Sequence, residues 1–285
     1  MTLAIVTDST ASLPADLASA REVTVVPLEV VVDARSYTEG IDVTPEDLAR
    51  ALRAGRAVST SRPSPERFAR TYADLVDRGA EAIVSIHLSS RVSATFESAQ
   101  MAAQDCAVPV SCVDSLQVGM ATGYAVLSAA DARDAGESAD DVAKAARDRS
   151  ERATTYFYVA TLEHLRRGGR IGTASALLGS ALSVKPILGV QDGQVRPIEK
   201  VRTSARAIAR LEELTAQAAA SHGDRVDVAV QHLDADAQAR SLADRLGESL
   251  GLSTVDVMEV GAVIGAHVGP GLLAVTVSGR PPVDV

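Results

Sequence analysis

The chain has 285 residues and a formal net charge of −9 at pH 7; 46% of its residues are hydrophobic and 23% are charged. This length exceeds what one hydrophobic core usually fills, so we expect two domains. The acidic balance argues against general nucleic-acid binding, which depends on positive charge. Aromatic residues make up only 3% of the chain, so the interior must be aliphatic, with few flat faces on which bases could stack.

The N-terminus and the two cysteines favour a cytoplasmic protein. MTLAIVTDST has no basic segment ahead of an apolar signal core, and no uncharged apolar stretch reaches the length of a membrane span. Cys106 and Cys112 have neither the number nor the spacing of a disulfide framework or a zinc site. We interpret both as small, buried apolar residues.

Strand-like and helix-like segments alternate up to about residue 150. Apolar runs indicate strands at 3–10, 21–33, 80–90 and 109–115. Helix signals cover 13–20, 44–55, 63–79, 93–104 and 119–136. This alternation predicts an α/β domain with a mainly parallel sheet, in which ligands bind beyond the carboxyl ends of the strands. Those ends carry TDST, STSRPS, HLSS and VDS, so hydroxyl groups should surround the crevice.

The second half, which begins near residue 154, repeats the α/β pattern. Residues 184–203 indicate a hairpin that turns at QDGQ. Helices are expected at 204–220 and 235–251, strands at 225–233 and 254–260, and the chain closes with an apolar segment at 261–279. There is no internal repeat and no low-complexity linker. We therefore predict two packed α/β domains, covering residues 1–158 and 159–285.

Two glycine-rich stretches carry candidate binding residues. RRGGRIG contains Arg166, Arg167 and Arg170 ahead of small and apolar residues that could form a helix, a pattern typical of a loop that holds an anion at a helix N-terminus. Arg166 and Arg167 are equally consistent with solvated surface arginines, whereas the glycines around Arg170 favour a specific role. In GAHVGPG, His267 is expected on a glycine-bounded loop, where function is favoured over packing.

The sequence contains no complete catalytic set. Neither a G-x-S-x-G elbow nor a P-loop is present, and the five histidines lack metal-site spacing. Asp8 could serve an aspartyl phosphatase, but TDSTAS has no second aspartate nearby, so we favour helix capping by Asp8 and Ser9. These residues could hold an anion without an evident means of transforming it.

A set of motifs spans nearly the whole chain. In order they are AIVTDSTASLP, STSRPSPERF, SSRVSATFESA, VDSLQVGMATG, LEHLRRGGRIGTASALLGSALSVKPIL, DGQVRPIEKVRT and HVGPGLLAV. Together they resemble the DegV family. The resemblance implies a two-domain α/β protein that holds one long-chain fatty acid in a tunnel as the lipid-binding subunit of a bacterial fatty acid kinase. A separate ATP-binding kinase protein would phosphorylate the acyl carboxylate, and this carrier would take the acyl phosphate towards phospholipid synthesis.

The resemblance also implies roles for individual residues. The matches to the family's carboxylate-binding positions are Thr60, Ser61, Ser93 and His267. The matches to supporting positions are Arg170, Thr95 and, near the tunnel mouth, Arg202. No catalytic residue, metal, cofactor or nucleic-acid partner is implied. A transient contact with a membrane surface is compatible with this role.

One motif departs from the family pattern. Relatives commonly have S-S-G-L-S-G-T-Y where this chain has SSRVSATF, so Arg91 and Ala94 replace glycines and Phe96 replaces tyrosine. If the first glycine takes a positive φ, Arg91 would strain the loop, and the head-group geometry or the partner surface would differ from that of relatives.

The sequence also leaves other functions open. The main alternative is a small phosphotransferase or phosphatase that uses Asp8 and the hydroxyl groups. A third is a regulatory module for which the lipid is a signal rather than cargo. The length, saturation and branching of the acyl chain and the oligomeric state do not follow from the sequence.

Overall fold

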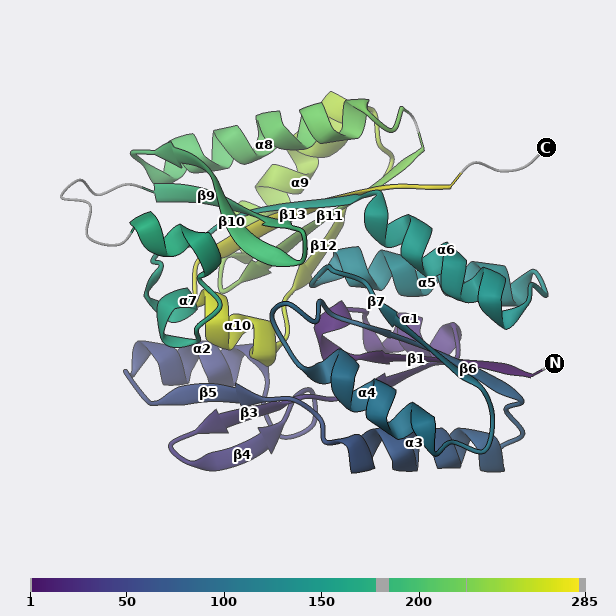
Figure 1. The fold of residues 1–285 in the computed structure, drawn as a ribbon. Coiled ribbons are helices and arrows are strands. Elements are labelled where there is room, and N and C mark those ends of the chain that lie inside the picture. Colours follow the sequence, from purple (N-terminus) through teal and green to yellow (C-terminus); the bar gives the residue numbers. More distant parts are fainter. Residues whose placement is uncertain (1, 178–184, 224, 282–285) are drawn as a thin grey trace.

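The computed structural model describes residues 2–177, 185–223 and 225–281. Over these residues the strands form three sheets, arranged with their helices into two halves that face each other (Figure 1). The expected α/β class and the parallel N-terminal sheet are confirmed. None of the described helices is both long and apolar enough to cross a membrane.

The first sheet is parallel, with the strand order β2-β1-β6-β7. Its strands are β1 (Leu3–Asp8), β2 (Val23–Val26), β6 (Ala82–His87) and β7 (Val110–Asp114). Its helices are α1 (Ala15–Ala20), α3 (Pro65–Asp77), α4 (Thr95–Gln104), α5 (Met120–Asp134) and α6 (Ala139–Glu151). α5 and α6 pack on one face while α3 and α4 pack on the other, which explains why nearly every residue of β1 and β6 is buried rather than every second one.

The second sheet has the order β10-β9-β8-β13-β11-β12 and is antiparallel except between β11 and β12. Its strands are β8 (Ala153–Tyr158), β9 (Lys185–Gln191), β10 (Gln194–Val201), β11 (Val226–Leu233), β12 (Asp256–Glu259) and β13 (Leu272–Gly279). The helices α8 (Ser204–Ala220) and α9 (Asp236–Leu250) cover one face. The opposite face is directed toward the first half of the chain.

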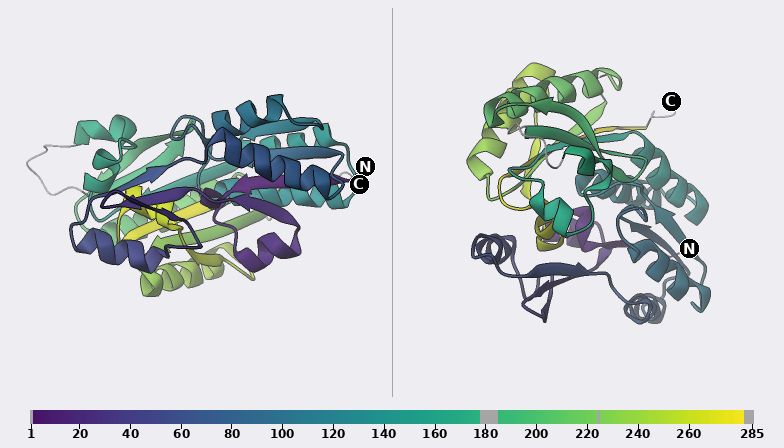
Figure 2. Two further views of the ribbon diagram at one scale, coloured as in Figure 1. Left: turned by 90° about the horizontal axis from the view of Figure 1, so that it is seen from below. Right: turned by 60° about the vertical axis from the view of Figure 1, so that its left-hand side comes forward.

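A small third sheet, β4-β3-β5, joins the halves. It contains β3 (Glu29–Val32), β4 (Arg35–Thr38) and β5 (Val58–Ser61). These strands and α2 (Pro45–Arg53) share one hydrophobic cluster with α10 (Ala262–Val268) and with β8, β9 and β13. Figure 2 shows this sheet as a separate layer beside α10. An N-terminal segment is therefore part of the core of the C-terminal half.

The expected strand over 21–33 is divided between two sheets. Proline 27 separates β2 from β3, and because proline has no N–H to donate to a ladder, the chain leaves one sheet there and enters the next. The helix starts, by contrast, follow their caps. Thr44 closes a capping box ahead of Pro45, and Ser64 caps the helix that begins at Pro65.

Two expectations near the glycine-rich stretches need correction. His267 lies in the last turn of α10, not in a loop. After RRGGRIG the structure contains a short 3-10 segment, Gly172–Leu177, instead of the start of an α-helix, and the rest of the expected helix lies outside the described residues. The short helix of this region, α7 (Glu163–Arg167), comes before the glycines.

The expected domain boundary between residues 158 and 159 stays a prediction. The pairing of β8 with β9 and β13 places the last strand of the expected first domain in the second sheet. Sheet topology therefore favours a division closer to residue 152.

Candidate functional site

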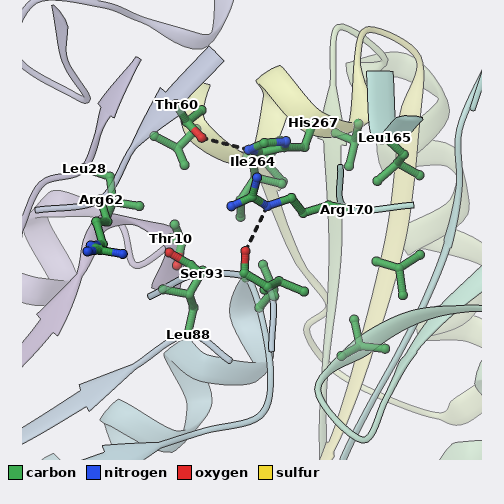
Figure 3. Close-up of a pocket in the computed structure, with 18 of the residues that line it drawn as sticks. Thr10, Leu28, Thr60, Arg62, Leu88, Ser93, Leu165, Arg170, Ile264 and His267 are labelled. Atoms are coloured by element: carbon green, nitrogen blue, oxygen red, sulfur yellow. Dashed lines mark hydrogen bonds between the residues drawn. The ribbon is translucent and has the colours of Figure 1, made fainter. Parts of the chain in front are cut away.

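A cavity of about 660 Å³ lies between the two halves (Figure 3). On one side it is lined by the segments that follow the carboxyl ends of β1, β6 and β7, as expected for a parallel sheet. The end of β5, which belongs to the antiparallel third sheet, lines the same side. On the other side it is lined by α10 and by the inner face of β8, β9, β10, β11 and β13. Its volume is in the range that small-molecule ligands occupy.

Polar side chains gather at one part of this cavity. Thr60 Oγ1 lies 2.8 Å from His267 Nε2, and Figure 3 shows Arg170 beside this pair and Ser93 on the facing loop. Ser61 also lines the cavity. The structure therefore brings together residues from β5, the loop after β6, the RRGGRIG stretch and α10, which are far apart in the sequence.

Hydrogen bonds from Thr95 and Arg170 fix the loop that carries Ser93 beside the Thr60–His267 pair. Ser93 Oγ lies 2.9 Å from Thr95 Oγ1, and Thr95 is fully buried. Arg170 donates from Nε to the carbonyl oxygen of Val92 at 2.9 Å and from Nη1 to that of Gly168 at 2.7 Å. Thr95 thus orients Ser93 without lining the cavity, while Arg170 ties the loop after β6 to the second half of the chain.

His267 is neutral at pH 7. Burial, followed by the nearby Arg170 charge, lowers its pKa to about 4. Nδ1 is buried and has no hydrogen-bond partner among the described residues, so a proton there would be left unpaired. The favoured tautomer carries its proton on Nε2 and donates it to Thr60. The Thr60 hydroxyl proton then remains available to an anion in the cavity.

The paired glycines of RRGGRIG explain how this geometry is held. A Cβ on Gly168 would lie 2.1 Å from His267 Nδ1, so only glycine allows the helix end to approach the ring this closely. Gly169 has a φ of 69°, which favours glycine. Sequence reasoning missed the role of Gly168, although the doubled glycine beside Arg170 was a signal for it.

Away from the polar group the cavity wall is largely apolar. Phe157, Ala274 and Gln231 stand opposite one another on neighbouring strands, and the small Ala274 leaves space between its larger neighbours. Two polar side chains on this wall already bond within the protein. Thr155 bonds to the Thr276 hydroxyl at 3.0 Å, and the amide oxygen of Gln231 accepts a hydrogen bond from a backbone N–H at 2.9 Å.

The unusual loop after β6 carries no sign of backbone strain. Arg91 is not among the described residues with positive φ, and Ala94 has a φ of −85°. The loop is fixed by Ser89, which donates to the carbonyl oxygen of Gly193 at 2.8 Å. Gly193 is the turn glycine of QDGQ, and its Cβ would lie 2.4 Å from that hydroxyl oxygen. The departure at Arg91 therefore changes the surface of the loop, and the strain expected there is absent.

Two predicted arginines lie elsewhere. Arg202 lines a separate hollow at the end of β10, with Arg206 and Arg210, and does not line the 660 Å³ cavity. Arg166 is exposed and bonds to Glu163 through Nε and Nη2 at 2.8 and 2.7 Å. The structure thus brings neither residue to the polar group.

Asp8 belongs to a buried hydrogen-bond network. Its carboxylate lies 2.9 Å from His87 Nδ1, and His87 Nε2 lies 2.7 Å from Ser85 Oγ, which accepts from the Tyr72 hydroxyl at 2.9 Å. The residue types match a hydrolase triad, but all four residues are at most 1% exposed. Asp8 also caps the short 3-10 helix Ser9–Ala11, which agrees with the capping role favoured above. A phosphatase that attacked through Asp8 would have no access to substrate.

Within residues 2–177, 185–223 and 225–281, no three histidine, cysteine, aspartate or glutamate side chains are grouped so that they could hold a metal ion.

Comparison with known proteins gives consistent matches along the whole chain. Residues 2–280 match the model of a family described as "Uncharacterised protein, DegV family". A DegV domain-containing protein of Streptomyces coelicolor is 51% identical over 279 residues, which cover 98% of this chain and 99% of the relative.

Solved structures resemble the fold closely. A DegV family protein of Thermus thermophilus, described by its fatty acid binding, has a TM-score of 0.88 at 34% identity and covers 98% of this chain and 100% of its own. DegV of Bacillus subtilis, described as a fatty acid binding protein, has a TM-score of 0.90 at 32% identity with the same coverage of both chains.

Proposed function

This chain belongs to the DegV family, and on that premise we propose that it binds one long-chain fatty acid in the cavity between its halves. The observation that carries the proposal is the make-up of this cavity, in which hydroxyl groups, the His267 imidazole and the Arg170 guanidinium adjoin a largely apolar wall. The fatty acid binding described for the Thermus and Bacillus relatives supports it.

Burial of the acyl chain provides most of the binding free energy. Each methylene removed from water contributes about 0.8 kcal/mol, so roughly 14 methylenes contribute on the order of 11 kcal/mol before ordering costs. Residues such as Leu28, Val190 and Val195 line the cavity and supply the apolar surroundings that this gain requires.

The carboxylate needs partners because it loses water when the chain enters the cavity. We assign hydrogen bonds to it from the hydroxyls of Thr60, Ser61 and Ser93, which can donate while leaving the group ionised. His267 orients the Thr60 hydroxyl, and Arg170 adds a positive charge nearby. A carboxylate held in this way remains a nucleophile.

We further propose a carrier role for a separate kinase, which is the role that the resemblance to the DegV family implies. A separate ATP-binding fatty acid kinase would place the γ-phosphorus of ATP near the carboxylate. A carboxylate oxygen would attack, the bond to the ADP oxygen would break, and ADP would leave. This chain would contribute no catalytic residue and no cofactor. It would then carry the acyl phosphate through the cytoplasm towards phospholipid synthesis, with a transient membrane contact for delivery.

Lipid extraction from gently purified protein tests the binding itself. We expect mass spectrometry to find a co-purified fatty acid in wild-type protein and less of it after Ser93→Ala. Ser98→Ala is the matched control, because Ser98 lies on the adjoining α4, bonds to the carbonyl oxygen of Ala94 and does not line the cavity. Protein that carries no fatty acid and takes none up from solution would refute the proposal.

A further inference from the structure

A second hollow, of about 530 Å³, lies directly behind the polar group. Thr60, Arg170 and His267 line both this hollow and the larger cavity, so the two spaces adjoin at these side chains. The walls of the second hollow come from the end of α2, from β5, from α7 and from α10, which lie next to one another in Figure 1.

The lining of this hollow is strongly basic. Arg56, Arg167 and Arg170 line it together with His164, and no acidic residue is among the described residues that line it. In a chain with a net charge of −9, three arginines around one hollow form a local concentration of positive charge. Such a site favours an anion that carries more than one negative charge and several acceptor oxygens.

Two of these arginines, Arg56 and Arg167, keep guanidinium nitrogens available for an anion. Arg167 uses Nε for Glu163 at 2.7 Å, and Arg56 uses Nε for Asp33 at 2.8 Å. For both residues the terminal guanidinium nitrogens have no hydrogen-bond partner among the described residues. These nitrogens are the ones that reach furthest from the backbone and can bind phosphate in a forked geometry.

The position of the hollow fits the geometry of an acyl phosphate. In such a molecule the phosphorus is bonded to a carboxyl oxygen, so the phosphoryl group must lie next to the carboxylate seat and away from the tail. The larger cavity extends from Thr60 and His267 along the apolar wall, and the second hollow begins at the same two residues.

We propose that the second hollow is a phosphate subsite, in which Arg56, Arg167 and Arg170 hold the phosphoryl group of a bound acyl phosphate. The inference rests on the proposed fatty acid binding and adds to it a part of the protein that distinguishes product from substrate. Retention of the phosphorylated lipid would then depend also on Arg56 and Arg167, which do not line the larger cavity.

The test compares two ligands that differ only at the head. One is palmitate, and the other is a β-ketophosphonate analogue of palmitoyl phosphate in which CH2 replaces the bridging oxygen. We expect the wild-type protein to bind the phosphonate more tightly than palmitate. Arg167→Gln should weaken phosphonate binding by about tenfold, the loss expected for one charge-assisted hydrogen bond, and should leave palmitate binding unchanged.

Arg166→Gln is the matched control. Arg166 bonds to the same Glu163 as its neighbour but does not line the hollow, so this variant should bind both ligands as the wild type does. An equal loss in both variants, or no wild-type preference for the phosphonate, would overturn the subsite. So would tight binding of inorganic phosphate to palmitate-loaded protein without a phosphonate preference, because that pattern indicates a free-phosphate site. Failure to bind palmitate at all would instead refute the underlying fatty acid proposal.

Discussion

Removal of the Thr60 hydroxyl tests the head-group geometry most directly. Thr60→Val keeps a β-branched side chain on β5, where Thr60 stands opposite Val30, so the strand should persist. The change deletes the group that lies 2.8 Å from His267 Nε2 and that we assign to the carboxylate. The perturbation is therefore confined to hydrogen bonding at one point of the cavity.

The expected magnitude has two parts. A hydrogen bond to a charged group is worth about 1.5–3 kcal/mol, so the dissociation constant for a fatty acid should rise roughly 10- to 150-fold. The imidazole Nε2 proton of His267 also loses its acceptor in both the free and the loaded protein. That second loss should lower the free energy of unfolding by about 1–3 kcal/mol without changing affinity.

Displacement of a fluorescent fatty acid at pH 7 measures the first part, and urea unfolding measures the second. Thr38→Val is the control, because Thr38 belongs to the same small sheet but does not line the cavity. A Thr60→Val protein that folds and binds within threefold of the wild type would show that this hydroxyl does not hold the carboxylate. A similar loss in Thr38→Val would show that the sheet, not the hydroxyl, is responsible.

Three further outcomes follow from the structure. Gly168→Ala should weaken fatty acid binding at least about tenfold, since its Cβ would lie 2.1 Å from His267 Nδ1 and displace the ring from Thr60; unchanged displacement titrations would contradict this. In the folded protein the pKa of His267 is lowered from 6.5 to about 4. As the pH drops between these values the unfolded chain takes up the proton first, so the free energy of unfolding falls by on the order of 3 kcal/mol. Urea unfolding at several pH values should show a smaller fall for His267→Gln, and an unaltered pH dependence would refute the assignment of this fall to His267. Asp227→Asn should lower the free energy of unfolding by about 3 kcal/mol, because it leaves the buried Arg149 without its carboxylate partner. Urea unfolding measures this loss, and a value below about 1 kcal/mol would contradict the prediction.

Local signals predicted the regular elements well. The helix signals over 44–55 and 63–79 begin within one residue of Thr44 and Ser64, which are the caps in the structure, because capping involves only neighbouring residues. The division of 21–33 at Pro27 was missed, since the strands on either side pair with partners far along the chain. Helix α6, Ala139–Glu151, and strand β4, Arg35–Thr38, were also not recognised.

The polar part of the candidate site was easier to predict than the apolar part. Thr60, Ser93 and His267 stand in distinctive motifs, and the structure brings them to one cavity. Phe157 and Ala274 look like any other residues of a buried strand. Their place in the wall depends on how β8 and β13 pair, which the sequence of either strand alone does not specify.

The small N-terminal sheet shares a hydrophobic cluster with α10, so binding of the proposed ligand and docking of the two halves are coupled. A ligand that contacts both halves binds only while they remain docked, and a hundredfold excess over its dissociation constant adds about 2.7 kcal/mol to the docked state. We expect the empty protein to open and to be digested by proteases more readily than the loaded one. The supply of fatty acid would then set how much of the protein a cell retains.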